Sequence, residues 1–417
     1  MVRSLIKKER YALTTNSLTP VQPAERINEI DIIRGFALFG ILMVNMSYFK
    51  APLYFERSPS EFPAGIEQLS AWFIQLLFTG KFYAIFSFLF GLGFYIFMER
   101  AVEKGYKLVP LYKRRLFALL CFGLLHLVLF WSGDILFTYA LGGFILLVFR
   151  KMSIDSIQKW IVGLFTASVL LNCILYFLKG MGEFLAGEDY QARLAEMMDS
   201  AIVAYNRYGF FELIAFRAEN EIPNALISAV IGVFLVLPYF LCGLYAGKKE
   251  IFKNLRGNIA QMKKICKWGF LFGSLFLLLF SLIEIGIWPT HVMFRDSLLS
   301  AFNYVASIFL FPAYIASVLL ALQANFWQRL LAPLASAGRM ALTNYLSQTL
   351  ICVLLFFGYG FGLYSKVSIA EGIIFTVIIY IFQIGFSNLW LRKFNYGPLE
   401  WLWRLLTYKK QPFMIEE

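Results

Sequence analysis

The chain has 417 residues, of which 59% are hydrophobic, 18% aromatic and only 15% charged. Soluble domains carry about 25% charged residues, so this composition excludes an ordinary soluble protein and any large soluble domain. The formal net charge is +12, but the Lys and Arg residues lie between apolar runs and do not cluster in one soluble module. We therefore expect the lipid bilayer, and no nucleic acid, as the main partner.

Apolar runs long enough to cross a bilayer recur along the chain. A bilayer core about 30 Å thick requires about 20 mostly apolar residues in a helix. The runs predict an all-α, polytopic integral membrane helix bundle forming a single domain over 1–417. We expect about ten transmembrane helices, at residues 32–49, 80–98, 114–132, 134–149, 157–178, 222–246, 268–288, 297–322, 340–358 and 369–391.

The segments between these runs divide by charge into two sets. Lys and Arg concentrate in the arm at 1–30 and after the second, fourth and sixth runs, whereas the longest loop, 179–221, is acidic. The positive-inside rule then places both termini in the cytoplasm and the acidic loop outside. The acidic loop divides the domain into N-terminal helices over 31–178 and C-terminal helices over 222–391. The expected location is the cell membrane, which the chain crosses several times.

Two shorter segments are predicted to lie at the membrane surface. Residues 66–78 are apolar but too short to cross, which predicts an interfacial or re-entrant helix on the outer face. Residues 396–410 alternate Trp and Leu with Arg and Lys, which is typical of an interfacial helix. The second segment belongs to the tail 392–417, which we expect on the cytoplasmic side.

The stretch HLVLFWSGDIL, residues 126–136, combines a histidine and a carboxylate in one of the most apolar regions of the chain. Ser132, Gly133 and Asp134 leave almost no loop between two crossings, which predicts a tight hairpin. Asp134 is expected to cap the second helix by accepting its unpaired N–H groups. His126, one of two histidines, either bonds a neighbouring helix as a neutral structural group or serves as a general base.

Polar residues also mark the first crossing. Asp31 and Arg34 lie three apart at its inner end, and Asn45 lies in its outer half. Asp31 and Arg34 can pair on one helix face as an interfacial anchor. Alternatively, Arg34 faces a cytoplasmic cavity and binds an anionic ligand such as a phosphate.

The ninth crossing begins with SAGRMALTNYLSQTLI, residues 336–351, which contains Arg339, Asn344, Tyr345 and Gln348. Asn344 and Gln348 share a helix face. A polar stripe on a spanning helix must point into the bundle, where it lines either a helix contact or a cavity.

Other polar and glycine-rich features receive simpler interpretations. We expect Glu284 to lie one helical turn inside the membrane boundary. We expect His291 to lie in a short loop on the outer face. Gly91 and Gly93 in FLFGLGF indicate close helix packing and no nucleotide loop. No Cys and His spacing predicts a metal site.

Five segments taken together resemble the YeiB-like family of bacterial membrane proteins, whose C-terminal half is classed as domain of unknown function 418. They are RINEIDIIRGFALFGILMVNM, GKFYAIFSFLFGLGF, RRLFALLCFGLLHLVLFWSGDILFTYALGG, GRMALTNYLSQTLICVLLFFGYGFGLY and NLWLRKFNYGPLEWLWRLLTY. They follow the family's order along nearly the whole chain.

The first helix and GRMALTNYLSQ are also similar to a wider superfamily of transmembrane acyltransferases. That resemblance implies a bundle with a cytoplasmic acyl-CoA entrance and an acceptor on the far face. Those enzymes place an essential histidine shortly after the first helix, whereas residues 50–80 here contain none. His126 would have to supply the base instead.

The leading functional expectation is a membrane acyltransferase that moves an acyl group, such as acetyl, from cytoplasmic acyl-CoA to a hydroxyl or amine. The acceptor would be a small molecule, glycan or lipid of the envelope or an exported molecule. Acyl-CoA is expected as a co-substrate, with no permanently bound cofactor. The expected catalytic residues are His126 and Asp134, and the expected substrate-binding residues are Asp31, Arg34, Asn45, Arg339, Asn344, Tyr345 and Gln348. The alternatives are a small-solute permease with His126 or Glu284 as a proton relay, and a non-catalytic scaffold or sensor.

Overall fold

The computed structural model of the chain describes residues 27–52, 58–103, 105, 107–253, 255 and 257–408. The expected N-terminal arm up to residue 26, and the end of the tail after residue 408, lie outside the described residues. Throughout the described ranges the protein is helical and contains no strand, which confirms the all-α prediction.

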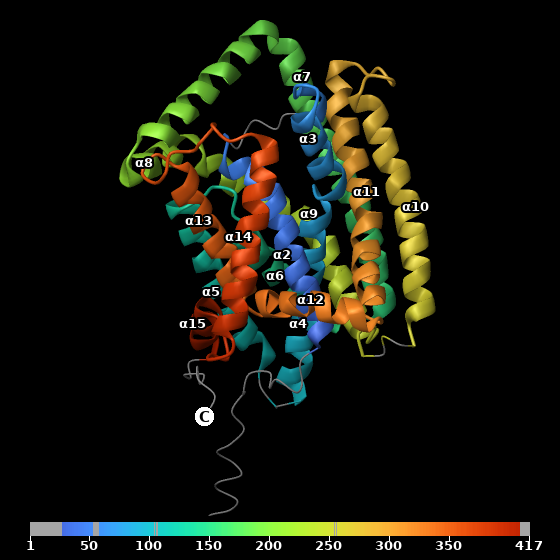
Figure 1. Cartoon of the computed structure of the whole chain (residues 1–417). Helices are drawn as coiled ribbons and strands as arrows, with labels where there is room; N and C mark the ends of the chain where they lie inside the picture. The colour runs from blue at the N-terminus through green and yellow to red at the C-terminus, as the bar shows by residue number, and fades with distance from the viewer. Residues whose placement is uncertain are drawn as a thin grey trace, which may run out of the picture.

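The helices follow one another with short connections (Figure 1). They are α2 (Asn28–Phe49), η2 (Pro59–Glu61), α3 (Ile66–Leu77), α4 (Lys81–Glu103), α5 (Leu108–Leu129), α6 (Leu136–Leu146), η3 (Leu147–Lys151), α7 (Ile154–Arg207), α8 (Phe210–Asn220), α9 (Ile222–Lys248), α10 (Ile259–Glu284), α11 (Val292–Ala321), α12 (Asn325–Arg339), α13 (Ala341–Phe356), α14 (Ile369–Trp390) and α15 (Pro398–Tyr408).

The described helices indicate a multi-pass membrane protein. Seven of them are long and apolar enough to cross a membrane, or up to eight if the bent pair of α12 and α13 forms one span. The predicted count of about ten is therefore not confirmed. Two predicted crossings do not qualify, because α5 carries three consecutive basic residues near its start and α6 has only 11 residues.

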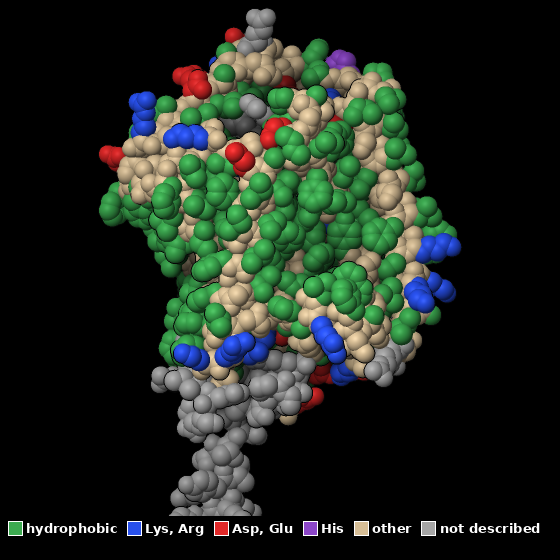
Figure 2. All heavy atoms as spheres, in the orientation of Figure 1, with side chains coloured by type: hydrophobic (Ala, Val, Ile, Leu, Met, Phe, Trp, Pro, Cys, Tyr) green, Lys and Arg blue, Asp and Glu red, His purple; other side chains and the backbone are tan. Residues whose placement is uncertain are grey.

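The surface agrees with a membrane-embedded bundle. Figure 2 shows a broad belt of hydrophobic side chains across the middle of one face, with Lys and Arg along its lower end near α12 and α15. We call this end, where α2 begins and α4 ends, the basic end.

Helix α12 was not predicted. It runs across the bundle at the basic end (Figure 1) and is bent by 82° from α13. Phe326, Trp327 and Leu330 on this helix are exposed. An amphipathic helix with exposed aromatic residues that lies across the bundle is typical of the membrane interface.

The acidic segment predicted as a loop is helical. Helix α7 continues to Arg207 with a kink at Gly187, where φ is 53°, and α8 follows it. In Figure 1 the second half of α7 folds back across the upper end of the bundle, opposite the basic end. These helices were not predicted, because a search for apolar runs finds only helices that are long and apolar enough to cross a bilayer.

Close packing of α4 against α9 depends on glycine. A Cβ built on Gly91 would lie 1.9 Å from the carbonyl oxygen of Phe240, and one on Gly243 would lie 2.0 Å from that of Phe88. Small residues at such contacts let two backbones approach closely. Gly93 has open space around its Cβ position, so the packing prediction holds for Gly91 and not for Gly93.

This difference gives a matched pair of variants. We expect Gly91→Ala to lower the free energy of unfolding by about 1–3 kcal/mol, because α4 and α9 must separate to admit the methyl group. Gly93→Ala should leave stability unchanged or raise it by up to about 1 kcal/mol, since alanine favours helices. Thermal unfolding of both variants in detergent checks this, and equal loss of stability would contradict the packing argument.

Candidate functional site

The site is built on the hairpin between α5 and α6. Helix α5 ends at Leu129 and α6 begins at Leu136, as the predicted tight hairpin requires. A Cβ on Gly123 would lie 2.4 Å from the backbone nitrogen of Phe137. Glycine at this position therefore lets the start of α6 lie against α5, which brings Asp134 next to His126.

His126 lies inside the bundle, between two hydrogen-bond partners. It is 2% exposed, its Nδ1 is 2.7 Å from Oδ2 of Asp134, and its Nε2 is 2.9 Å from Oγ1 of Thr349 on α13. The side chain of Asp134 is fully buried, and its Oδ1 accepts a hydrogen bond of 2.7 Å from the backbone N–H of Phe137. Asp134 therefore caps α6, as predicted, and orients His126 as well.

The hydrogen bonds define the direction of proton donation. An ionised carboxylate only accepts, so in the neutral imidazole Nδ1 of His126 carries the proton and donates it to Asp134. Nε2 then carries no proton, and its lone pair accepts a hydrogen bond from the hydroxyl of Thr349. A histidine held in one tautomer by a carboxylate is the arrangement that supports general-base chemistry at the other nitrogen.

Two aromatic side chains complete the surroundings of His126. The ring of Tyr345 lies 5.5 Å from it, and the ring of Trp131 lies 6.4 Å from it, edge-on. Trp131 is 2% exposed, and its indole Nε1 has no hydrogen-bond partner in the described part of the chain. A buried donor without a partner costs stability unless a ligand or water meets it, so this atom can donate to a ligand at the site.

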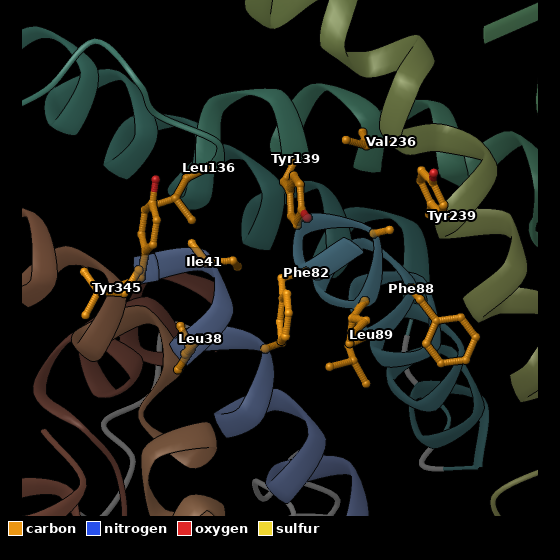
Figure 3. Close-up of a cluster of buried hydrophobic side chains, with 14 of the residues drawn as sticks. Leu38, Ile41, Phe82, Phe88, Leu89, Leu136, Tyr139, Val236, Tyr239 and Tyr345 are labelled. Atoms are coloured by element: carbon orange, nitrogen blue, oxygen red, sulfur yellow. The ribbon is translucent and has the colours of Figure 1, made fainter. Parts of the chain in front are cut away.

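A cavity of about 490 Å³ runs from the basic end into the bundle. On α2 its lining extends from Ile27 to Ile41, which corresponds to about 21 Å along a helix at 1.5 Å per residue. Its deep end is lined by Leu136 and Tyr345, which Figure 3 shows close to Ile41 at one side of the buried hydrophobic cluster. His126 does not line the cavity, but the ring of Tyr345, which does, lies 5.5 Å from the ring of His126.

Among the described residues, six basic and four acidic side chains line the cavity. The carboxylates already have partners. Asp31 pairs with Arg34 at 2.7 Å, while Glu99 and Glu250 lie 3.0 and 2.9 Å from the amine of Lys253.

The fourth carboxylate, Glu400, caps α13. It accepts from the backbone N–H groups of Leu342 and Thr343 at 2.6 and 3.1 Å, and from the Thr343 hydroxyl at 2.6 Å. Burial raises the pKa of Glu400, although these hydrogen bonds oppose the shift. The acidic groups of the cavity are thus engaged within the protein.

Several arginines remain oriented toward the cavity. The guanidinium of Arg115 stacks on Trp403 at 3.8 Å, and that of Arg404 lies 4.4 Å from the ring of Tyr396. Arg339 donates to the carbonyl of Asn395 at 3.5 Å, and its buried Nε has no partner within the residues that the structure describes. Guanidinium groups on aromatic faces, with donors to spare, suit a planar or anionic ligand such as a nucleotide phosphate.

The structure brings together only some of the predicted site residues. Asp31, Arg34, Arg339 and Tyr345 line the cavity, and His126 and Asp134 lie beyond its deep end. Asn45 is half-buried and does not line the cavity.

The polar stripe on α13 faces a neighbouring helix and not the cavity. Asn344 donates to Ser387 at 2.9 Å and to the carbonyl of Ala337 at 3.0 Å, and Gln348 donates to Gln383 at 2.9 Å. The bonds to Ser387 and Gln383 join α13 to α14, and the bond to Ala337 joins it to α12. Asn344 and Gln348 therefore do not line the cavity that was expected to bind substrate.

Sequence reasoning missed Thr349. The signal was its position four residues after Tyr345, which places both on one helix face, adjacent to the Asn344 and Gln348 face. A single threonine in an apolar helix draws little attention, because its hydroxyl can bond the helix's own backbone.

A second buried cluster supports the hairpin from the side opposite the basic end. Arg217 and Glu221 are 1% and 4% exposed, and their side chains lie 3.7 Å apart. Glu221 accepts from Ser132 at 2.6 Å and from Tyr205 at 2.9 Å, and Arg217 donates to Ser132 at 3.2 Å. The cluster therefore holds the turn that carries Asp134.

Glu284 has a defined structural partner. Its carboxylate accepts from Arg295 at 2.9 Å and from the hydroxyl of Ser60 at 2.6 Å. His291 accepts from the N–H of Met293 at 3.4 Å and caps α11. Both residues thus have structural roles away from the cavity.

Comparison with known proteins places this architecture in a family. The chain is 34% identical over 412 residues to the uncharacterized protein YxaH of Bacillus subtilis (strain 168), covering 94% of this chain and 97% of the relative. It is 31% identical over 411 residues to the uncharacterized protein YeiB of Escherichia coli (strain K12), covering 92% and 97%. The chain belongs to the YeiB-like family.

Two further matches agree with membership of the YeiB-like family. A 39.9 kDa protein from the amylase 3′ region of Bacillus acidopullulyticus is 31% identical over 409 residues, covering 96% of this chain and 99% of the relative. The family described as protein of unknown function (DUF418) matches residues 246–410. That segment contains Arg339, Tyr345 and Thr349, whereas His126 and Asp134 precede it.

Proposed function

We propose that this YeiB-like protein is a membrane-bound acyltransferase that uses His126 as its general base. The single observation that carries the proposal is a buried histidine, fixed by a carboxylate, that lies just beyond the deep end of a cavity lined by several arginines. That combination provides a proton acceptor shielded from water and a separate binding region for an anionic substrate.

The donor that fits the cavity is an acyl-CoA thioester. Its phosphates would form charge-assisted hydrogen bonds with the guanidinium groups of Arg34, Arg339 and Arg404. Its adenine ring would pack against the stacked pair of Arg115 and Trp403. The deep, apolar part would receive the pantetheine arm and direct the thioester toward Tyr345. The basic end would face the cytoplasm, where acyl-CoA is made and where positive charge concentrates.

The chemistry requires three contributions from the chain. His126 takes the proton of an acceptor hydroxyl or amine as this attacks the thioester carbonyl, and later returns the proton to the leaving thiolate. Asp134 stabilises the imidazolium that forms in between. The hydroxyl of Tyr345 and the N–H of Trp131 are the donors available to the developing oxyanion. The acceptor would be a small molecule, glycan or lipid of the cell envelope.

Labelled acetyl-CoA and membrane extract test the proposal. Purified wild-type protein should transfer label to an extractable acceptor, and His126→Ala should not. Label that is absent from both samples, or equal in both, would rule out the proposed mechanism.

Arg339 provides a test of donor binding. We expect Arg339→Gln to raise the KM for acetyl-CoA about tenfold, the equivalent of about 1.4 kcal/mol, because one charge-assisted contact to a phosphate is lost. Its kcat should change little. Arg329→Gln is the matched control, since Arg329 is exposed on the same helix and does not line the cavity. Equal KM values for both variants and the wild type would contradict the assignment of the phosphate site.

A further inference from the structure

Thr349 completes an arrangement of three groups that is known from covalent catalysis. Its Oγ1 lies 2.9 Å from Nε2 of His126, whose Nδ1 lies 2.7 Å from Asp134. A nucleophile and a base within about 2.6–3.2 Å of each other, with the base oriented by a third group, is the signature of an activated nucleophile. Threonine hydroxyls act as such nucleophiles when a base takes their proton.

We propose that Thr349 is the catalytic nucleophile and carries the acyl group as an ester between donor and acceptor. This inference rests on the proposed acyltransferase function, and it replaces the direct attack of the acceptor on the thioester with two steps through Thr349. The reaction then becomes a double displacement, and the two substrates need not occupy the site at the same time.

In the first half-reaction, His126 takes the proton of the Thr349 hydroxyl. The oxygen forms a bond to the thioester carbonyl carbon, and the carbon–sulfur bond breaks. The CoA thiolate leaves with the proton returned by His126, so the products are free CoA and acyl-Thr349.

In the second half-reaction, His126 takes the proton of the acceptor hydroxyl or amine. The acceptor forms a bond to the ester carbonyl, and the bond from that carbon to the Thr349 oxygen breaks. The proton on His126 returns to Thr349, which restores the enzyme and releases the acylated acceptor.

The position of Thr349 suits this role. It is 1% exposed and follows Tyr345 by one helical turn, and Tyr345 lines the deep end of the cavity. A thioester that displaces the Tyr345 ring therefore reaches Thr349 on the same face of α13. The indole N–H of Trp131, whose ring lies 6.4 Å from that of His126, is a donor with no partner among the described residues.

Isotope exchange tests the inference. Purified protein in nanodiscs is incubated with acetyl-CoA and labelled CoA without acceptor, and labelled acetyl-CoA is measured. We expect exchange, and after acid quenching we expect an acetylated peptide that contains Thr349. The samples are the wild type, Thr349→Val, Thr349→Ser and Ser347→Ala, each checked for thermal stability.

Thr349→Val should lose both exchange and the acetylated peptide, because valine keeps the shape and removes the hydroxyl. Thr349→Ser should retain both, which shows that the hydroxyl and not the packing is required. Ser347→Ala should match the wild type, since Ser347 accepts from Gln383 at 2.8 Å and faces α14.

The outcomes separate the two proposals. If the wild type acylates an acceptor from membrane extract but shows no exchange, and Thr349→Val acylates it at the same rate, the covalent step is overturned and the acyltransferase proposal stands. If the wild type acylates no acceptor and shows no exchange, both are overturned.

Discussion

Replacing His126 with glutamine is expected to lower the rate of acyl transfer by about 10²- to 10⁴-fold, the usual contribution of a general base. Glutamine has a similar length and can still bond Thr349, but it cannot take up a proton at neutral pH. The loss should appear in kcat, with the KM for acetyl-CoA nearly unchanged, because His126 lies beyond the cavity that would hold the donor. The measurement is steady-state transfer from labelled acetyl-CoA.

The second histidine provides a matched control. His291→Asn removes the other imidazole but keeps a side chain that caps α11 well, so activity and stability should stay near those of the wild type. An equal loss of activity in both variants would indicate that the effect comes from the fold or the membrane, and would contradict a catalytic role for His126.

Replacing Arg217 with methionine is expected to lower the free energy of unfolding by about 3–5 kcal/mol, because the buried carboxylate of Glu221 loses the buried cation that lies 3.7 Å from it. Transfer activity should fall as well, since Glu221 and Arg217 hold Ser132 in the turn that carries Asp134. The double variant Arg217→Met with Glu221→Leu should be more stable than the single one, because it removes both charges. Thermal unfolding in detergent compares them.

An exposed ion pair provides the control for this cluster. Lys179 is half exposed and lies 2.8 Å from Asp296. Lys179→Met should change the free energy of unfolding by no more than about 1 kcal/mol, as exposed pairs usually do. A double variant at Arg217 and Glu221 that is less stable than Arg217→Met would show that the hydroxyls bound to Glu221, rather than its charge, dominate the cluster.

The sequence predicted those parts of the site that depend on neighbours along the chain. His126 and Asp134 are eight residues apart on either side of a short turn, and Asp31 and Arg34 are three apart on one helix. Their pairing follows from helix geometry and a tight connection alone. The all-helical, membrane-spanning class followed in the same way from the length of the apolar runs.

Contacts between distant segments were not predictable in this way. Thr349 is 223 residues from His126, and nothing in either segment specifies that α13 packs against α5. The inward direction of Asn344 and Gln348 was predictable, because polar groups avoid lipid. Asn344 and Gln348 face α14, whereas Tyr345 faces the cavity. These directions depend on the rotation of α13 about its axis, which is set by its packing against the other helices.

Helix α12, the second half of α7 and the short helix α8 were missed for a different reason. Helix α12 contains Pro333 and several polar residues, so it lacks the long apolar run by which spanning helices were detected. The second half of α7 is acidic and highly charged, and it forms a helix beyond the apolar run. Runs of apolar residues report on lipid exposure and give little information about helices outside it.

The permease alternative makes a different prediction from the acyltransferase proposal. A transporter that used Glu284 as a proton relay would need that carboxylate to change partners, whereas it is bound to Arg295 and Ser60. Such a protein would also show solute flux driven by an ion gradient. An enzyme consumes thioester with no gradient present.

Release of free CoA thiol from acetyl-CoA by purified protein in nanodiscs, supplied with membrane extract and without any ion gradient, tests the central claim most directly. We predict thiol release that depends on the extract and is lost in His126→Gln but not in His291→Asn. No thiol release by the wild type, or equal release by the wild type and His126→Gln, would contradict the assignment of His126 as the base of an acyltransferase.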